Sequence, residues 1–123
     1  MIGYEKLCEY LLGKPGAWQD MPFGPDALVF KVLKKMFALV AWQSEPLTIS
    51  LKADPVDALI LRKQYKAVTP DYHMNKKHWN TVTLDGSLPD DEVYRMIDES
   101  YSLVVEGMTR ADQARVKGHG STH

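Results

Sequence analysis

The hydrophobic positions of this chain repeat with helical spacing in three segments. The first segment predicts a helix over residues 2–13, with an apolar stripe formed by Tyr4, Leu7, Cys8, Leu11 and Leu12. The second predicts a helix from Asp54, which can cap the first turn, to about Tyr65. The third helix follows Pro89, and its buried face is predicted to consist of Val93, Met96, Ile97, Tyr101, Val104, Val105 and Met108.

Five shorter segments have the composition and spacing of β-strands, namely residues 17–21, 27–33, 36–42, 47–52 and 77–84. The third of these is almost entirely apolar, which indicates a central strand. The fourth alternates apolar and polar residues, which is typical of a half-buried strand with one wet face. Because short turns join the strands, the sheet is predicted to be antiparallel, with helices covering one face. The predicted fold is therefore a two-layer α+β sandwich with a sheet of about five strands.

A chain of 123 residues with 45% apolar and 25% charged side chains has the size and composition of one globular domain. We expect that domain to span residues 1–109, because residues 110–123 are polar and predict a disordered tail. We see no signal peptide and no apolar run long enough to span a membrane. The single cysteine, Cys8, excludes an internal disulfide, and its place on an apolar stripe favours a packed thiol over a nucleophile. We therefore expect a cytoplasmic monomer.

The charged residues are unevenly distributed, although the net charge is only −1. Residues 31–77 contain nine basic and four acidic residues, whereas residues 85–112 contain eight acidic and two basic ones. This asymmetry predicts either two oppositely charged faces or solvated surfaces that differ by chance, and the sequence leaves both interpretations open. The low net charge argues against a strong, non-specific binder of polyanions.

The stretch from Pro70 to Leu84 is the richest in groups that can bind a ligand, and its candidate residues are Tyr72, His73, Asn75, Lys76, Lys77, His78 and Trp79. The chain has no nucleophile–base motif and no glycine-rich phosphate loop, so we expect it not to be an enzyme. His73 and His78 with Asp71 would suggest a metal site, but their spacing matches no tight ligand pattern. We therefore expect neither a metal nor a cofactor.

Trp79 offers a specific chemistry beside Lys77 and Thr81. On an antiparallel sheet an aromatic ring can stack on a nucleic-acid base while neighbouring amines contact phosphates. The alternative is that Trp79 covers the sheet and the lysines are merely solvated. The residues alone favour this alternative.

Eight segments together resemble the MmcQ/YjbR family of small bacterial proteins: Lys14–Ala17, Pro22–Gly24, Val29–Val32, Lys35–Leu39, Leu51–Lys52, Tyr72–Trp79, Leu84–Gly86 and Ser100–Tyr101. The most specific is Tyr-His-Met-Asn-Lys-Lys-His-Trp, which begins at Tyr72. The chain departs from the family pattern at the hairpin Leu33-Lys34-Lys35-Met36, which lacks the usual glycine before the lysine. It also has Asp71 where glycine often precedes the tyrosine, which places a negative charge beside the predicted site.

The resemblance implies an α+β fold related to the bacterial frataxin-like and secretion-chaperone-like folds. Members of the family are commonly described as DNA-binding proteins with a double-wing arrangement, and no enzymatic activity defines the family. Frataxin-like handling of iron would need acidic residues clustered on the first helix, where only Glu5 and Glu9 are suitable.

These observations lead to a principal hypothesis, a non-enzymatic DNA-binding protein. In it, phosphates are contacted by Lys31, Lys35, Lys52, Lys76 and Lys77. Trp79 with His73 and His78 supplies stacking or hydrogen bonds. A second hypothesis is a protein- or peptide-binding module in which Trp79, Tyr72 and Met74 form an anchor pocket. A third is a small-ligand site, which requires a concave cavity behind the loop Tyr72–Trp79.

Overall fold

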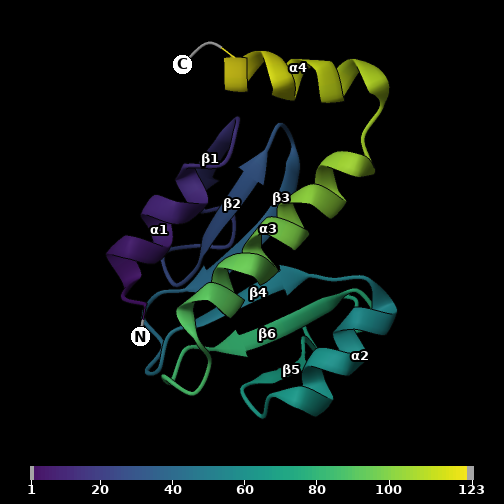
Figure 1. Cartoon of the computed structure of the whole chain (residues 1–123). Coiled ribbons are helices and arrows are strands. Elements are labelled where there is room, and N and C mark those ends of the chain that lie inside the picture. The colour runs from purple at the N-terminus through teal and green to yellow at the C-terminus, as the bar shows by residue number, and fades with distance from the viewer. Residues whose placement is uncertain (1, 122–123) are drawn as a thin grey trace.

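The computed structural model describes residues 2–121, and the side chains of residues 2–118. The described residues form a six-stranded sheet and four helices (Figure 1). In chain order the elements are α1 (Tyr4–Leu12), β1 (Ala17–Asp20), β2 (Leu28–Val32), β3 (Lys35–Ala41), β4 (Thr48–Lys52), α2 (Pro55–Gln64), β5 (Val68–Pro70), β6 (Trp79–Thr83), α3 (Asp90–Glu106) and α4 (Arg110–Ser121). Over the described part of the chain, no helix combines the length and the hydropathy needed to cross a membrane.

The sheet is antiparallel throughout and has the strand order β1-β2-β3-β4-β6-β5. Figure 1 shows α1 and α3 lying across one face of the sheet, with α2 beside β5 and β6. The predicted two-layer α+β sandwich is confirmed, and the apolar β3 is a central strand as its composition indicated. The predicted sheet of about five strands has six, because Val68–Pro70 forms the short edge strand β5.

Strand residues alternate between the helix-covered face and a second face that we call the open face. Ala38 and Leu51 are neighbours in register on the helix-covered face and are at most 2% exposed. Leu39 and Ser50 are neighbours on the open face. The predicted wet face of residues 47–52 is wrong at Ser50, which is only 8% exposed. Residues of the loops after β1 and after β5 line a pocket on this face together with Leu39, the register neighbour of Ser50.

The helices begin and end close to their predicted positions. Asp54 caps α2 as predicted, since its Oδ2 accepts a 3.1 Å hydrogen bond from the backbone N–H two residues later. In α1, Leu7 and Leu11 are buried and Cys8 packs against the core. Burial raises the pKa of the Cys8 thiol, as expected for a packed thiol. Leu12 is 41% exposed because α1 ends there, so its predicted place on the buried stripe is wrong.

The hairpin between β2 and β3 turns at Leu33 and Lys34, one residue earlier than predicted. Leu33 has a φ of 54°, in the left-handed region that favours glycine. The indole Nε1 of Trp18 donates a 2.8 Å hydrogen bond to the carbonyl oxygen of Leu33. The glycine missing from this hairpin is therefore replaced by a strained leucine that a neighbouring strand holds in place.

Ser100 on α3 completes the sheet where β3 and β4 separate. The pairing of these strands stops at Ala38 and Leu51. One position further, the backbone N–H of Lys52 donates a 2.9 Å hydrogen bond to Ser100 Oγ, and this hydroxyl donates one of 2.6 Å to the carbonyl oxygen of Phe37. The fully buried Ser100 hydroxyl thus replaces a direct bond between the strands and ties α3 to both of them.

Residues 110–121 form the helix α4, so the prediction of a disordered tail is wrong for this part of the chain. Thr109 precedes the helix, and its Oγ1 accepts a 3.1 Å hydrogen bond from the backbone N–H of Asp112. Val116 is only 4% exposed and belongs to the core. Among the described side chains of α4, Val116 alone is buried, and the polar residues around it gave the sequence no apolar pattern to detect. Residues 122–123 of the predicted tail lie outside the described residues.

Glu99 on α3 predicts a pH dependence of stability. Burial raises the pKa of its carboxyl and the hydrogen bond to Asp57 raises it further, while Arg95 at 3.3 Å opposes this shift. Because the folded state binds this proton more tightly than the unfolded state, stability falls as the pH rises from the unfolded-state pKa through the folded-state pKa. Glu99→Gln should therefore raise the Tm at about pH 7, and the gain should disappear toward about pH 4.

The matched control is Glu92→Gln, which removes the other carboxylate bonded to Arg95, at 2.5 Å. It should not raise the Tm, since it only removes a favourable contact. Thermal denaturation followed by circular dichroism would contradict the prediction if Glu99→Gln lowered the Tm at neutral pH.

Candidate functional site

The loop between β5 and β6, residues 71–78, is shaped by two side chains that bond to its own backbone. Asp71 is only 4% exposed, and its Oδ1 accepts a 3.0 Å hydrogen bond from the N–H of His73. Asn75 Oδ1 accepts a 3.0 Å bond from the N–H of Lys77, and its carbonyl oxygen accepts two further backbone N–H groups at 3.0 and 2.9 Å. Such bonds stabilise tight turns. Asp71 is therefore turned into the loop and does not present its charge to a ligand on the surface.

Arg62 of α2 anchors this loop from the helix-covered side. Its Nε donates a 2.7 Å hydrogen bond to Oδ1 of Asn80, and its terminal nitrogen donates to the carbonyl oxygen of Lys76. Asn80 is 2% exposed and donates in turn to the carbonyl oxygen of Ala58 at 3.4 Å. One guanidinium group thus connects the loop to both α2 and β6.

A hollow on the open face separates this loop from the loop that joins β1 to β2. We call it the open-face pocket; it has a volume of about 450 Å³ and is lined by Phe23, Met36, Leu39, His73, Met74 and Asn75. Four of these six side chains are apolar. Phe23 is 71% exposed, so its ring is available to a ligand. Apolar walls with a few polar groups are the usual form of a site for a small organic group.

The pocket provides the cavity that the small-ligand hypothesis required behind the loop Tyr72–Trp79. His73, Met74 and Asn75 of the predicted site line it. Tyr72 is 74% exposed and lies outside the lining, as does Trp79. Of the predicted anchor of Trp79, Tyr72 and Met74, only Met74 therefore lines the open-face pocket.

Two of the five predicted phosphate-binding lysines do not offer a free ammonium group on the open face. Lys31 lies on the open face, but its ammonium is 3.0 Å from Asp20 and 5.2 Å from the centre of the Trp18 ring. This bond lowers the pKa of the Asp20 carboxyl. Lys35 pairs in register with the buried Val32, which places it on the helix-covered side of the sheet, at the start of β3 beside the hairpin turn.

The other three predicted lysines lie near the loop. Lys52 and Trp79 are direct neighbours across β4 and β6 on the open face. Lys76 and Lys77 are exposed within the loop itself. His78 is half-buried, and its backbone N–H and carbonyl are bonded to Asn75 and to the residue after β4. The structure therefore gathers part of the predicted site around the pocket.

Three residues that line the pocket were not among the predicted site residues, namely Phe23, Met36 and Leu39. Phe23 stands between a proline and a glycine in a turn, where a large apolar side chain is unusual, and this was a usable signal. Met36 and Leu39 belong to a strand that is apolar on both faces. Because helices cover only one face of the sheet, apolar residues on the other face of β3 indicated that this face is covered by loops or binds a ligand.

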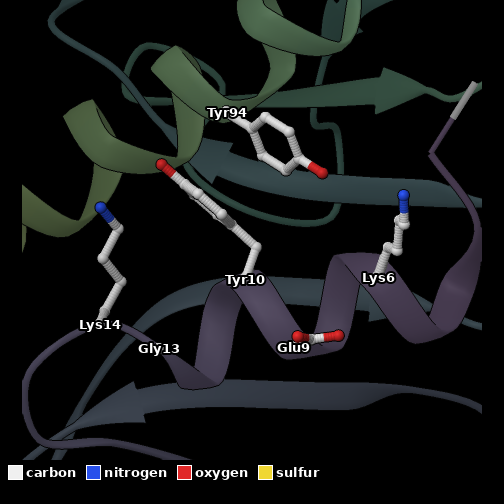
Figure 2. A pocket seen from close by; sticks show the side chains of 6 residues that line it. All are labelled: Lys6, Glu9, Tyr10, Gly13, Lys14 and Tyr94. Atoms are coloured by element: carbon white, nitrogen blue, oxygen red, sulfur yellow. The ribbon is translucent and has the colours of Figure 1, made fainter.

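A second hollow, a groove between α1 and α3, has a volume of about 420 Å³ and is lined by Lys6, Glu9, Tyr10, Gly13, Lys14 and Tyr94 (Figure 2). The rings of Tyr10 and Tyr94 pack with their centres 4.2 Å apart. The Tyr10 hydroxyl donates a 2.6 Å hydrogen bond to Asp98, which also forms an ion pair with Lys14. Burial, together with the bond to Asp98, raises the pKa of Tyr10 to about 12.

The polar groups at one end of this groove are used for internal bonding. Lys14 lies 5.1 Å from the Tyr10 ring centre, and the Tyr101 hydroxyl donates a 2.5 Å bond to the carbonyl oxygen of Pro15. These contacts therefore attach α1 and the turn that follows it to α3. In the part of the chain that the structure describes, no three His, Cys, Asp or Glu side chains are grouped as a metal site would need.

The YjbR family model matches residues 12–103 of the chain. The chain belongs to the YjbR family. It is 42% identical to the uncharacterised protein YjbR of Escherichia coli strain K12 over 100 residues, which are 81% of this chain and 85% of that protein. It is 38% identical to the uncharacterised protein YbdF of Escherichia coli O157:H7 over 96 residues, which are 78% of this chain and 79% of the relative.

Solved structures of similar proteins share the fold of this YjbR chain. The Deinococcus radiodurans protein DR2400, with the family-model domain DUF419, is 37% identical and superposes with a TM-score of 0.88 over 95% of this chain and 89% of its own. A Pseudomonas syringae protein is 30% identical, with a TM-score of 0.72 over 83% of this chain and 98% of its own. The resemblance inferred from the sequence is confirmed.

The extent of the YjbR match distinguishes the two hollows. All six residues of the open-face pocket lie within residues 12–103, whereas Lys6, Glu9 and Tyr10 of the groove precede them. The open-face pocket belongs entirely to the part of the chain that the YjbR family model describes, so we take it as the candidate functional site.

Proposed function

We propose that this YjbR protein is a non-enzymatic DNA-binding protein that binds single strands by placing one unstacked base in the open-face pocket. The observation that carries the proposal is the composition of that pocket. The ring of Phe23 and the imidazole of His73 are exposed aromatic surfaces, and Asn75 supplies an amide. Stacking of one base on an aromatic side chain contributes about 1–3 kcal/mol.

The charges near the pocket support contact with a few phosphates. Within the described part of the chain, the ammonium groups of Lys52, Lys76 and Lys77 make no ion pair. Lys31 is already neutralised by Asp20. Three available cations are few compared with a duplex-binding protein, so we expect moderate affinity and a moderate dependence on salt.

The form of the pocket favours single strands over duplexes. A paired base is held inside the helical stack, and removing it costs a few kcal/mol. The pocket lies between two loops on a sheet face, where an unpaired base can enter without that cost. Single-stranded DNA should therefore bind more tightly than a duplex of the same sequence.

The test is a titration of tryptophan emission with single- and double-stranded oligonucleotides at two salt concentrations. Three phosphate contacts to a single strand predict a loss of affinity of about 20-fold between about 50 and 200 mM salt. Lys76→Ala/Lys77→Ala should weaken binding and reduce that salt dependence. Phe23→Ser should weaken binding while leaving the salt dependence unchanged, because it removes stacking and no charge.

The matched control is Lys34→Ala, which removes an exposed lysine from the hairpin turn and should change neither quantity. Absence of saturable binding at the lower salt concentration would overturn the proposal. Tighter binding of the duplex than of the single strand would overturn the role given to the pocket.

A second candidate function is the binding of an apolar side chain of a protein partner. It is favoured by the apolar lining and by the 71% exposure of Phe23. Under this alternative, oligonucleotides do not bind, whereas apolar peptides bind with little dependence on salt and lose affinity in Phe23→Ser. The same titration with a panel of peptides distinguishes the two functions.

A further inference from the structure

Three large hydrophobic side chains form an outward stripe on α2. Val56, Leu59 and Ile60 are 64%, 57% and 53% exposed, and their spacing places them on one side of the helix. The opposite side of α2 packs on the protein through Ala58 and Leu61, which are buried. A solvated helix normally carries polar residues on its outer side. The stripe therefore has the composition of a surface that a partner covers.

The charges on α2 make this stripe complementary to itself. Asp54 lies at its beginning and Lys63 lies in its last turn, at the end of the stripe, whereas Asp57 is hydrogen-bonded to Glu99 of α3 and is left out of this surface. Arg62 is directed to the loop 71–78 and is not part of this surface. When two copies of α2 pack antiparallel, the acidic beginning of each helix lies beside the basic end of the other. No different partner is needed to satisfy both ends.

We infer that α2 is the contact through which two copies of this chain associate as a two-fold symmetric pair. With the helices antiparallel and centred between residues 59 and 60, Leu59 of one copy meets Ile60 of the second copy. Lys63 then packs its aliphatic stem on Val56 of the second copy and extends its ammonium toward the acidic beginning of that helix. The same patch serves on both copies, as a two-fold contact requires.

The position of α2 allows such a contact. Figure 1 shows α2 at the end of the molecule away from α1 and α4, next to β5. The open-face pocket lies on the other face of the sheet, so the pair leaves it accessible. The inference does not rest on the proposed function, and it replaces the monomer expected from the sequence.

The first test is the sedimentation of the full chain over a range of concentrations. The patch is small, so we expect a concentration-dependent equilibrium between monomer and dimer between about 10 μM and 1 mM. Leu59→Lys should abolish association over this range, because it places two ammonium groups at the centre of the contact. Leu12→Lys on α1 is the matched control, since Leu12 is also an exposed leucine on a helix and should not matter.

The second test uses cysteine cross-linking in a Cys8→Ser background. In the antiparallel pair the two copies of residue 60 are offset by only about 1.5 Å along the axis, whereas the two copies of residue 56 are about 10 Å apart. A disulfide requires Cα atoms within about 7 Å. Ile60→Cys should therefore form a cross-linked dimer under mild oxidation, Val56→Cys alone should not, and Val56→Cys mixed with Lys63→Cys should.

Three results would overturn the inference. The first is a chain that remains monomeric at about 1 mM, since even a weak contact is populated there. The second is a dimer that persists in Leu59→Lys or dissociates in Phe23→Lys, which would place the contact on the open face. The third is efficient cross-linking of Val56→Cys alone, which would indicate parallel helices.

Discussion

Replacing Ser100 by alanine should lower the free energy of unfolding by about 2–4 kcal/mol, although it removes a single oxygen atom. The Ser100 hydroxyl accepts from the N–H of Lys52 and donates to the carbonyl of Phe37, in a position that is fully buried. Phe37 is the extra residue of β3 at the β-bulge where the register between β2 and β3 shifts. Alanine leaves both backbone groups without this partner, and each buried, unsatisfied group then destabilises the folded state by its desolvation penalty.

The measurement is equilibrium unfolding in urea, with the matched control Ser102→Ala two residues later on α3. Ser102 is exposed, so its replacement should change the free energy by less than about 0.5 kcal/mol. Ser100→Thr should recover part of the loss, because it keeps the hydroxyl but adds a methyl group to a packed site. An effect of Ser100→Ala no larger than that of Ser102→Ala would show that the strands close on each other without the hydroxyl.

Replacing Arg62 by methionine should release the loop 71–78 while α2 remains folded. The substitution leaves Oδ1 of the buried Asn80 without its donor, at a cost of about 1–3 kcal/mol, and removes the bond to the carbonyl of Lys76. The aliphatic part of the side chain is retained, so packing changes little. Amide hydrogens of the loop should then exchange faster than those of β4 and α3.

The loop supplies three of the six residues of the open-face pocket, so ligand binding should weaken together with loop order. We expect about a tenfold loss of single-strand affinity, which corresponds to about 1.4 kcal/mol of additional ordering on binding. Lys66→Met is the control, since it removes an exposed charge near the end of α2 without touching the loop. Unchanged exchange in the loop of Arg62→Met would show that the turns around Asp71 and Asn75 suffice to hold it.

The elements with strong periodicity were predictable from the sequence, and the others failed for identifiable reasons. The apolar stripe of α3 and the N-cap residue Asp54 of α2 were sufficient to predict these two helices. The edge strand β5 was missed because it has only three residues and ends in a proline, which reads as a turn. The helix α4 was missed because Val116 is the only buried residue among its described side chains, and one large apolar residue gives no periodicity.

The candidate site was predicted in its position along the chain but not in its shape. The loop residues His73 and Asn75 were identified because polar and aromatic groups are concentrated there. Their partners Met36 and Leu39 lie on a distant strand, and only the fold shows that the loop lies against it. The loss of Lys31 from the set of available cations depends on pairing of β1 with β2, which no local pattern reveals.

The two edge strands of the sheet, β1 and β5, determine whether strands of other molecules can add to it. β1 has four residues and ends in a charged aspartate, and β5 has three residues and ends in Pro70, which has no N–H to donate. Neither edge offers the long, flat row of unpaired backbone groups on which a foreign strand can add. The folded protein is therefore a poor template for fibril growth.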